Sequence, residues 1–142
     1  MTGSSKPRVT PCVYLVPDGF AGWATICFAV TGAEPLVRED GARLIRIPAD
    51  GYLETSSPQE LGILNQRFYF VDGAGTRTPL DRPAAKYGAD PNAAWKQHDR
   101  PVVLGFHTGT ADDDEGHHMF ERFYVGHGPA GDPPGWRSRA AD

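Results

Sequence analysis

Residues 12–30 read CVYLVPDGFAGWATICFAV, two runs rich in β-forming residues on either side of a short break. The break, Pro17–Gly22, contains a proline, an aspartate and two glycines, which are residues that turns favour. Two such runs around a turn signal predict a β-hairpin. If the hairpin is centred on the break, Cys12 faces Cys27, the only other cysteine of the chain.

Cys12 and Cys27 are therefore candidates for a disulfide. Opposed cysteines on antiparallel strands can be bridged where their Cα atoms approach closely. The bond would close a loop of about 15 residues, which the chain-entropy model equates with ~3 kcal/mol. The alternative is two reduced thiols that pack as small apolar side chains. The choice between them depends on whether the compartment is oxidising.

The composition excludes several classes of protein. The chain has 142 residues, the length of one domain, and a formal net charge of −4. Its lysines and arginines are scattered rather than gathered in a basic stripe, so we expect no nucleic-acid partner. No apolar run approaches the ~18 residues of a transmembrane helix. Residues 1–11 contain no apolar segment of the kind found in signal peptides.

Further short runs with β-forming character follow, separated by turn residues. The pairs that we expect are Arg43–Ile47 with Tyr52–Thr55, Arg67–Val71 with Thr76–Thr78, and Pro101–His107 with Met119–Val125. Helix-start signals, in which a capping residue precedes a proline, occur at Ser57 and Asp90. Gly62 limits the first helix to about one turn.

The whole pattern predicts an all-β protein with seven to nine short strands and one or two short helices. We expect an antiparallel β-sandwich, immunoglobulin-like or transthyretin-like, rather than a small barrel. The sandwich should span residues 12–126. Residues 1–11 are expected to form a flexible segment, and residues 127–142, rich in glycine and proline, a disordered tail.

Several motifs in order resemble a bacterial family known as a domain of unknown function. Its members open with Y-L-I-P-x-G-Y-x-G-W, and residues 14–23 read YLVPDGFAGW. The later pieces that fit lie at residues 35–41, 47–51, 55–58, 68–72 and 123–126. Many members look like exported proteins or lipoproteins, so the resemblance implies an extracytoplasmic location. It implies no activity and no catalytic residues.

The acidic and histidine-rich run at residues 112–118, DDDEGHH, is a candidate metal site. Its candidate ligands are Asp112, Asp114, His117 and His118. Carboxylates suit Ca²⁺ or Mg²⁺, whereas imidazoles beside carboxylates suit Zn²⁺ or Ni²⁺. The spacing matches no EF-hand, and adjacent histidines on a strand point to opposite faces. The alternative is a solvated hairpin loop, and no other cofactor is expected.

His107, His118 and Glu121 are the residues that favour an enzyme. They lie near the ends of the last predicted strand pair, where they could act as general acid and base. The chain has no G-x-S-x-G motif and no phosphate-binding glycine loop, so no nucleophile or nucleotide site is indicated. A hydrolase that depends on this 107–121 region, with or without a metal ion, is the alternative function.

The aromatic residues indicate binding. Successive rings in Arg67–Val71 project to opposite sides of a strand, so some of them lie outside the core between the sheets. They are either covered by residues 81–100, for instance by Trp95, or exposed as a patch for a partner. We take Trp23, Tyr14 and Tyr69 as the candidate binding residues.

The leading hypothesis is therefore a non-catalytic binding or interaction module at the bacterial cell envelope. Its partner would be a protein or a small ligand. A structural protein that acts only through assembly is a further alternative.

Overall fold

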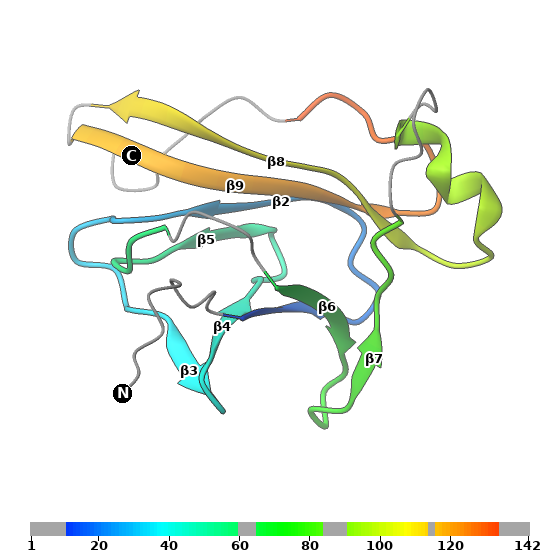
Figure 1. Ribbon diagram of the computed structural model, residues 1–142, viewed down its shortest axis with the longest axis horizontal. Helices are drawn as coiled ribbons and strands as arrows, with labels where there is room; N and C mark the ends of the chain where they lie inside the picture. The colour runs from blue at the N-terminus through cyan, green and yellow to red at the C-terminus, as the bar shows by residue number, and fades with distance from the viewer. Residues whose placement is uncertain (1–10, 60–64, 84–90, 114–115, 134–142) are drawn as a thin grey trace, which may run out of the picture.

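The protein is a two-layer β-sandwich (Figure 1). The computed structural model describes residues 11–59, 65–83, 91–113 and 116–133. These ranges contain nine strands and one short 3-10 helix, η1. Their bounds are β1 Cys12–Pro17, β2 Gly22–Cys27, β3 Val37–Glu39, β4 Ala42–Arg46, β5 Tyr52–Glu54, β6 Gln66–Val71, β7 Arg77–Pro79, η1 Pro91–Gln97, β8 Val102–Asp113 and β9 Gly116–Gly126.

The strands form two sheets that face each other. Sheet A has the order β3-β4-β1-β6-β7, and sheet B has the order β5-β2-β9-β8. Sheet B is the upper layer in Figure 1 and sheet A the lower one. The prediction of an all-β sandwich is confirmed, and so are the antiparallel pairs β6–β7 and β8–β9. The signal at Asp90 corresponds to η1, whereas residues 60–64 of the other predicted helix lie outside the described residues.

The hairpins predicted at 12–30 and 43–55 are wrong, and the sheets are mixed rather than antiparallel. β1 lies in sheet A between two parallel neighbours, β4 and β6. β2 lies in sheet B, parallel to β5 and antiparallel to β9. For β1 and β2, the physical reason is that both strands are apolar at nearly every position. This pattern is typical of central strands covered on both faces. Each run takes such a central place in its own layer.

Two segments that cross from sheet A to sheet B, β1–β2 and β4–β5, therefore stack side by side. The amide of Thr25 in β2 donates a hydrogen bond to the carbonyl oxygen of Gly51 at 2.7 Å, which continues the pairing of β2 with β5. Gly51 has a φ of +80°, and a Cβ there would lie 2.6 Å from the carbonyl oxygen of Trp23. Glycine is thus the residue that allows this close approach.

The core lies between the inner faces of the two sheets. Because side chains alternate along a strand, Tyr14 and Val16 of β1 face sheet B, whereas Ile26 of β2 and Phe123 of β9 face sheet A. Phe68 stacks on Tyr14 with a centroid separation of 4.6 Å. This aromatic cluster fixes how the two layers sit on each other.

The predicted disulfide is wrong, because no disulfide joins Cys12 and Cys27, which are both buried. Cys12 belongs to the core cluster of sheet A. Cys27 follows Ile26, whose side chain enters the core, so the Cys27 side chain lies on the opposite face of sheet B. The prediction failed because β1, which carries Cys12, and β2, which carries Cys27, belong to different sheets.

We expect the stability of the protein to be independent of reductant. Both thiols should react with Ellman's reagent after unfolding without prior reduction, and they should react slowly in the native state because they are buried. The thermal midpoint with and without dithiothreitol is the second measurement. A midpoint that falls on reduction would contradict a structure without a disulfide between Cys12 and Cys27.

Candidate functional site

Tyr14 is a core residue rather than a surface binding residue, so this part of the predicted patch is wrong. Its side chain is 0% exposed. Its hydroxyl donates a hydrogen bond to Oε1 of Glu121 at 2.6 Å and accepts one from Nε2 of Gln66 at 3.1 Å. Tyr14 shares the inner face of β1 with Cys12 and Val16, which belong to the same core cluster.

The Tyr14–Glu121 pair is the centre of a polar network between the sheets. Gln59 donates from Nε2 to Oε2 of Glu121 at 3.2 Å, and Arg82 donates from Nη1 to Oε1 of Gln66 at 2.5 Å. Burial, together with the charge of Glu121, raises the pKa of Tyr14 far above its usual value. Tyr14 therefore stays protonated and acts as a permanent donor that ties β1 to β9.

Trp23 is half-buried on the outer face of sheet B, where it holds neighbouring segments together. Its indole Nε1 donates a hydrogen bond to the carbonyl oxygen of Gly131 at 3.0 Å. The ring meets His107 and Tyr124 edge to face, with centroid separations of 6.1 and 5.7 Å. A Cβ on Gly105, beside the irregularity in β8, would lie 3.2 Å from the indole. These contacts give Trp23 a packing role.

His107, His118 and Glu121 do not form one site. Glu121 faces the core of the sandwich, where it is 3% exposed and bonded to Tyr14 and Gln59. His118 lies three residues earlier on the same strand, so its side chain is on the other face of sheet B. His107 pairs with Arg122 and shares that outer face. A carboxylate on one face cannot exchange a proton directly with imidazoles on the other.

Most of the predicted metal site lies outside the described side chains. Asp114 is outside the described residues, and Asp112 and His117 are described only as a cross-strand backbone pair near the end of β8 and β9. His118 is 5% exposed. Among the described residues, no group of three or more potential ligands is close enough to hold a metal ion. The four-residue metal site thus stays a prediction.

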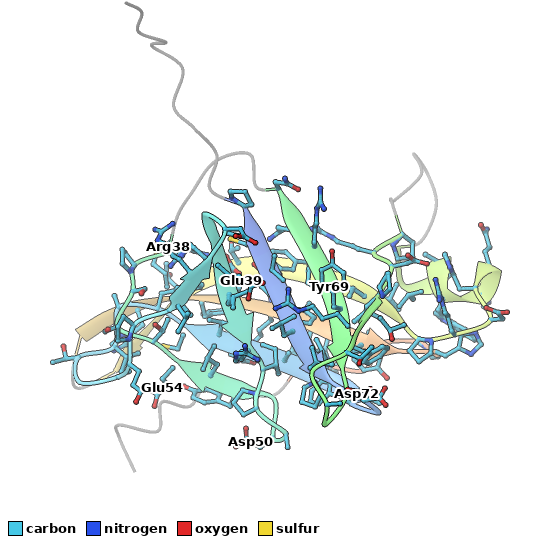
Figure 2. The ribbon with its side chains drawn as sticks, turned by 90° about the horizontal axis from the view of Figure 1, so that it is seen from below. Arg38, Glu39, Asp50, Glu54, Tyr69 and Asp72 are labelled. Carbon is cyan, nitrogen blue, oxygen red and sulfur yellow. The ribbon has the colours of Figure 1, made fainter. Side chains whose placement is uncertain are left out.

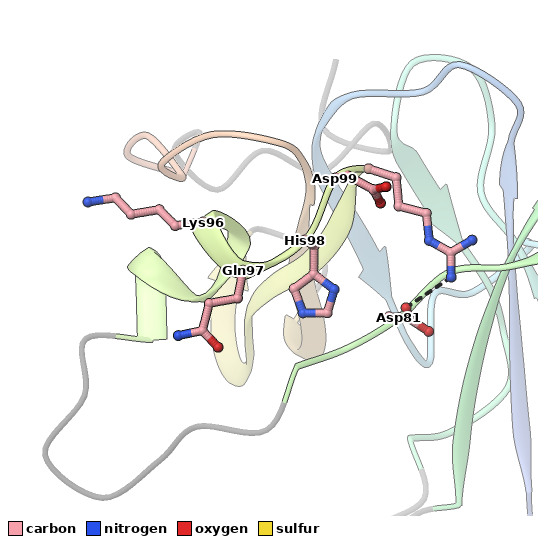
Figure 3. A pocket seen from close by; sticks show the side chains of 6 residues that line it. Asp81, Lys96, Gln97, His98 and Asp99 are labelled. Atoms are coloured by element: carbon pink, nitrogen blue, oxygen red, sulfur yellow. Dashed lines mark hydrogen bonds and ion pairs between the residues drawn. The ribbon is translucent and has the colours of Figure 1, made fainter.

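Two cavities are lined by described residues. One, of about 900 Å³, is an open depression between η1 and Asp81, lined also by Lys96, His98 and Arg100. In Figure 3 the side chains of Lys96, Gln97 and His98 spread in different directions. Arg100 donates to Asp81 at 3.1 Å, which fastens this segment to the chain after β7. Side chains that do not converge make this depression a poor binding site.

The other cavity, of about 150 Å³, opens at the sandwich edge between β4 and β5. Its apolar lining includes Leu36, Leu44 and Leu53, and Arg46 stands among its polar residues. Val37, on its border, is 63% exposed. Leu44 and Arg46 also belong to the outer face of sheet A, so the cavity adjoins that face.

Tyr69 lies on the outer face of sheet A, half-buried and turned away from sheet B. In the pairing register Leu15 stands between Arg46 and Tyr69 in one row across β4, β1 and β6. Alternation places Arg67 of β6 and Arg77 of β7 on the same face. We call this surface, formed by Leu15, Arg46, Arg67, Tyr69 and Arg77, the arginine face. Figure 2 looks at it from below and shows Tyr69 near the middle of the view.

The arginine face is concave. Glu39 of β3 and Arg77 of β7 lie on opposite edges of sheet A. In a flat sheet four strand spacings would separate them by roughly 19 Å. Yet Nη2 of Arg77 lies 3.1 Å from Oε2 of Glu39. Sheet A must therefore twist and coil until these two corners meet, and in Figure 1 both edge strands bend away from sheet B.

The model of a family of unknown function, DUF6843, matches residues 8–130. The chain belongs to this family. The match covers all nine strands and confirms the resemblance to a domain of unknown function. A search of curated proteins gave no match to this DUF6843 member.

A solved structure shares the fold of this DUF6843 member. That crystal structure is described as a "Putative Lipoprotein from Bacillus anthracis". The two chains are 22% identical, with a TM-score of 0.63, and the likeness covers 94% of this chain and 87% of the other. The likeness shows a common fold. Within the described ranges, no helix of this DUF6843 member has the length and apolarity to cross a bilayer.

Sequence reasoning predicted a binding role for Tyr69 but did not single out the arginines around it. Arg46 and Arg67 each occupy an outward position in a strand whose neighbouring residues are buried or half-buried. A charged residue that alternates with buried ones was a visible signal of the outer face. Their convergence was not visible, because β4 and β6 are separated in the sequence and are brought together only by β1.

Proposed function

We propose that this DUF6843 member is a non-catalytic binding module of the bacterial cell envelope, and that the arginine face is its binding surface. Tyr69 carries the proposal, because it is the one predicted binding residue whose ring lies half-exposed on a concave face. Tyr14 is sealed in the core, and Trp23 is held by its packing contacts. Concave surfaces with an aromatic ring and a few charged groups are typical of ligand sites.

Two further observations support the proposal. The protein with the shared fold is described as a lipoprotein, which is in keeping with a place at the envelope. The residues of the alternative hydrolase, His107, His118 and Glu121, lie on two faces of sheet B. Fractionation of cells that express the native gene tests the location, with the protein expected in the envelope fraction rather than in the cytosol.

Replacing Tyr69 by alanine is expected to weaken ligand binding about tenfold or more, because the ring would supply a central contact of the site. The measurement is an NMR titration of the labelled protein with solubilised cell-wall oligosaccharides. Shifts should cluster at β4, β1 and β6, and the thermal midpoint of the variant should stay close to that of the wild type.

Tyr124→Ala is the matched control, since it makes the same change on the outer face of sheet B. Shifts that cluster around Trp23 instead, or binding that Tyr69→Ala leaves unchanged, would contradict the proposed surface. Cleavage of the oligosaccharides, detected by mass spectrometry, would contradict a non-catalytic role.

A further inference from the structure

The arginine face has a charge opposite to that of the chain as a whole. The outward charged residues of β3, β4, β6 and β7 on this face are Arg46, Arg67, Arg77 and Glu39. These outward strand positions carry three positive groups and one negative group, whereas the chain carries a net charge of −4. Glu34 and Glu54 lie beyond them, beside Arg46 at the edge cavity. A positive patch on an acidic protein attracts an anion to one place on its surface.

Two of these arginines, Arg46 and Arg67, are available to pair with a ligand. Arg46 and Arg67 are exposed, and neither has a hydrogen-bond or ion-pair partner within the described parts of the chain. Arg77 is already paired with Glu39, and both side chains are partly exposed. The row Arg46–Leu15–Tyr69 puts a guanidinium and an aromatic ring on either side of a buried leucine. Guanidinium groups match carboxylates and phosphates through paired N–H donors.

In the middle of the arginine face the backbone is not available for binding a ligand. β4, β1 and β6 are interior strands of sheet A, so their amides and carbonyls are used in pairing with their neighbours. An extended peptide binds sheets by adding to an edge strand, and the middle of this face, formed by β4, β1 and β6, offers no such edge. A ligand must be recognised by side chains alone, through the charge of the arginines and the flat ring of Tyr69.

The shape and charge of the arginine face limit the class of ligand further. A bilayer surface is flat, and the arginine face curves inward until its opposite corners join through Arg77 and Glu39. Nucleic-acid binding usually uses a longer basic stripe than the two unpaired arginines of this face. A slender chain of sugar rings with spaced acidic groups fits the curvature, the ring and the two separate guanidiniums.

We propose that the ligand of the arginine face is an anionic oligosaccharide, whose acidic groups pair with Arg46 and Arg67 while a sugar ring lies against Tyr69. This inference rests on the proposed function and names its ligand class. Arg77 joins the site when an acidic group of the ligand displaces Glu39. An exposed ion pair of this kind is weak, so a ligand can compete for it.

The test uses tetragalacturonate, which carries one carboxylate on each ring, and its methyl ester as the neutral counterpart. Isothermal titration should give a dissociation constant for the acid at least about tenfold lower than for the ester. Arg46→Gln and Arg67→Gln should each weaken binding of the acid about tenfold, with unchanged thermal midpoints because both side chains lack partners. Arg100→Gln, an exposed arginine beside η1, is the control and should bind like the wild type.

Glu39→Gln is expected to have the opposite effect on binding of the acid. It frees Arg77 and removes the carboxylate that is paired with it, so the acid should bind several-fold more tightly. A merely structural role for the ion pair would lead to equal or weaker binding.

Each other outcome overturns the inference in a recognisable way. If the ester binds as well as the acid, and Tyr69→Ala abolishes both, the proposed function stands and the anionic class is wrong. If tetragalacturonate does not bind at millimolar concentration, the inference fails. If anionic lipid vesicles bind instead and the two arginine variants prevent it, the ligand is a membrane surface.

Discussion

Phe123→Ala is expected to lower the free energy of unfolding by about 3–5 kcal/mol. Phe123 is 0% exposed and lies at the centre of the core between the sheets. Its ring meets Phe68 edge to face at a centroid distance of 5.1 Å and stacks on Phe106 at 6.1 Å. Alanine would remove these contacts from both layers and leave a cavity that β-sheets cannot close by small shifts.

Urea unfolding followed by fluorescence measures this loss. Phe120→Ala is the control on the same strand, because Phe120 pairs with Cys27 and lies half-buried on the other face of β9. Its effect should be clearly smaller. Equal effects at the two positions would mean that the core is not centred between the two sheets.

Tyr14→Phe is expected to lower the free energy of unfolding by about 1.5–3 kcal/mol, although it removes a single oxygen atom. The reason is that Glu121, which is 3% exposed, loses its shortest hydrogen bond, 2.6 Å, and keeps its position in the interior. Tyr69→Phe makes the same chemical change on a half-buried outer side chain and should have little effect. An equal response of the two variants would show that the inter-sheet network contributes nothing.

The same pair has a pH dependence with a definite sign. Tyrosines of the unfolded chain ionise near pH 10, whereas burial and Glu121 raise the pKa of Tyr14 in the native state. Above pH about 10 the unfolded state therefore binds fewer protons than the native state, and stability falls as the pH rises. Tyr14 contributes up to about 1.4 kcal/mol per pH unit to this fall in the free energy of unfolding. Tyr14→Phe should lose stability less steeply between pH 10 and 11.5 than the wild type.

Local sequence patterns determined most of the strands of this protein, although β3, Val37–Glu39, was not predicted. The aromatic and β-branched residues of Arg67–Val71 and the turn residues at 72–75 were enough to predict the β6–β7 hairpin. The family followed from ordered motifs that span most of the chain. The break at Pro17–Gly22 correctly marked the end of one strand and the start of the next.

The break at residues 17–22 did not determine whether the next strand would join the same sheet or the opposite one. A turn of this kind serves equally to return a strand within its sheet or to carry it into the opposite layer. The choice depended on neighbours far along the sequence, since β4 and β6 flank β1, and β9 flanks β2. For this reason Cys12 and Cys27, which seemed opposed in a hairpin, are separated by the core.

The candidate site divides in the same way. Tyr69 could be assigned to an outer face from the sequence, because neighbouring residues of a strand alternate between its two faces. Its arginine neighbours belong to strands that meet only through the parallel pairing with β1, and Glu39 and Arg77 meet only because sheet A coils. Alternation and turn chemistry act over a few residues, so the sequence by itself determined most of the strands and the turns between them. It did not determine every face, because Tyr14 was predicted at the surface and lies in the core. Pairing and curvature depend on the packing of the whole chain, so only the tertiary structure decided what those faces bring together.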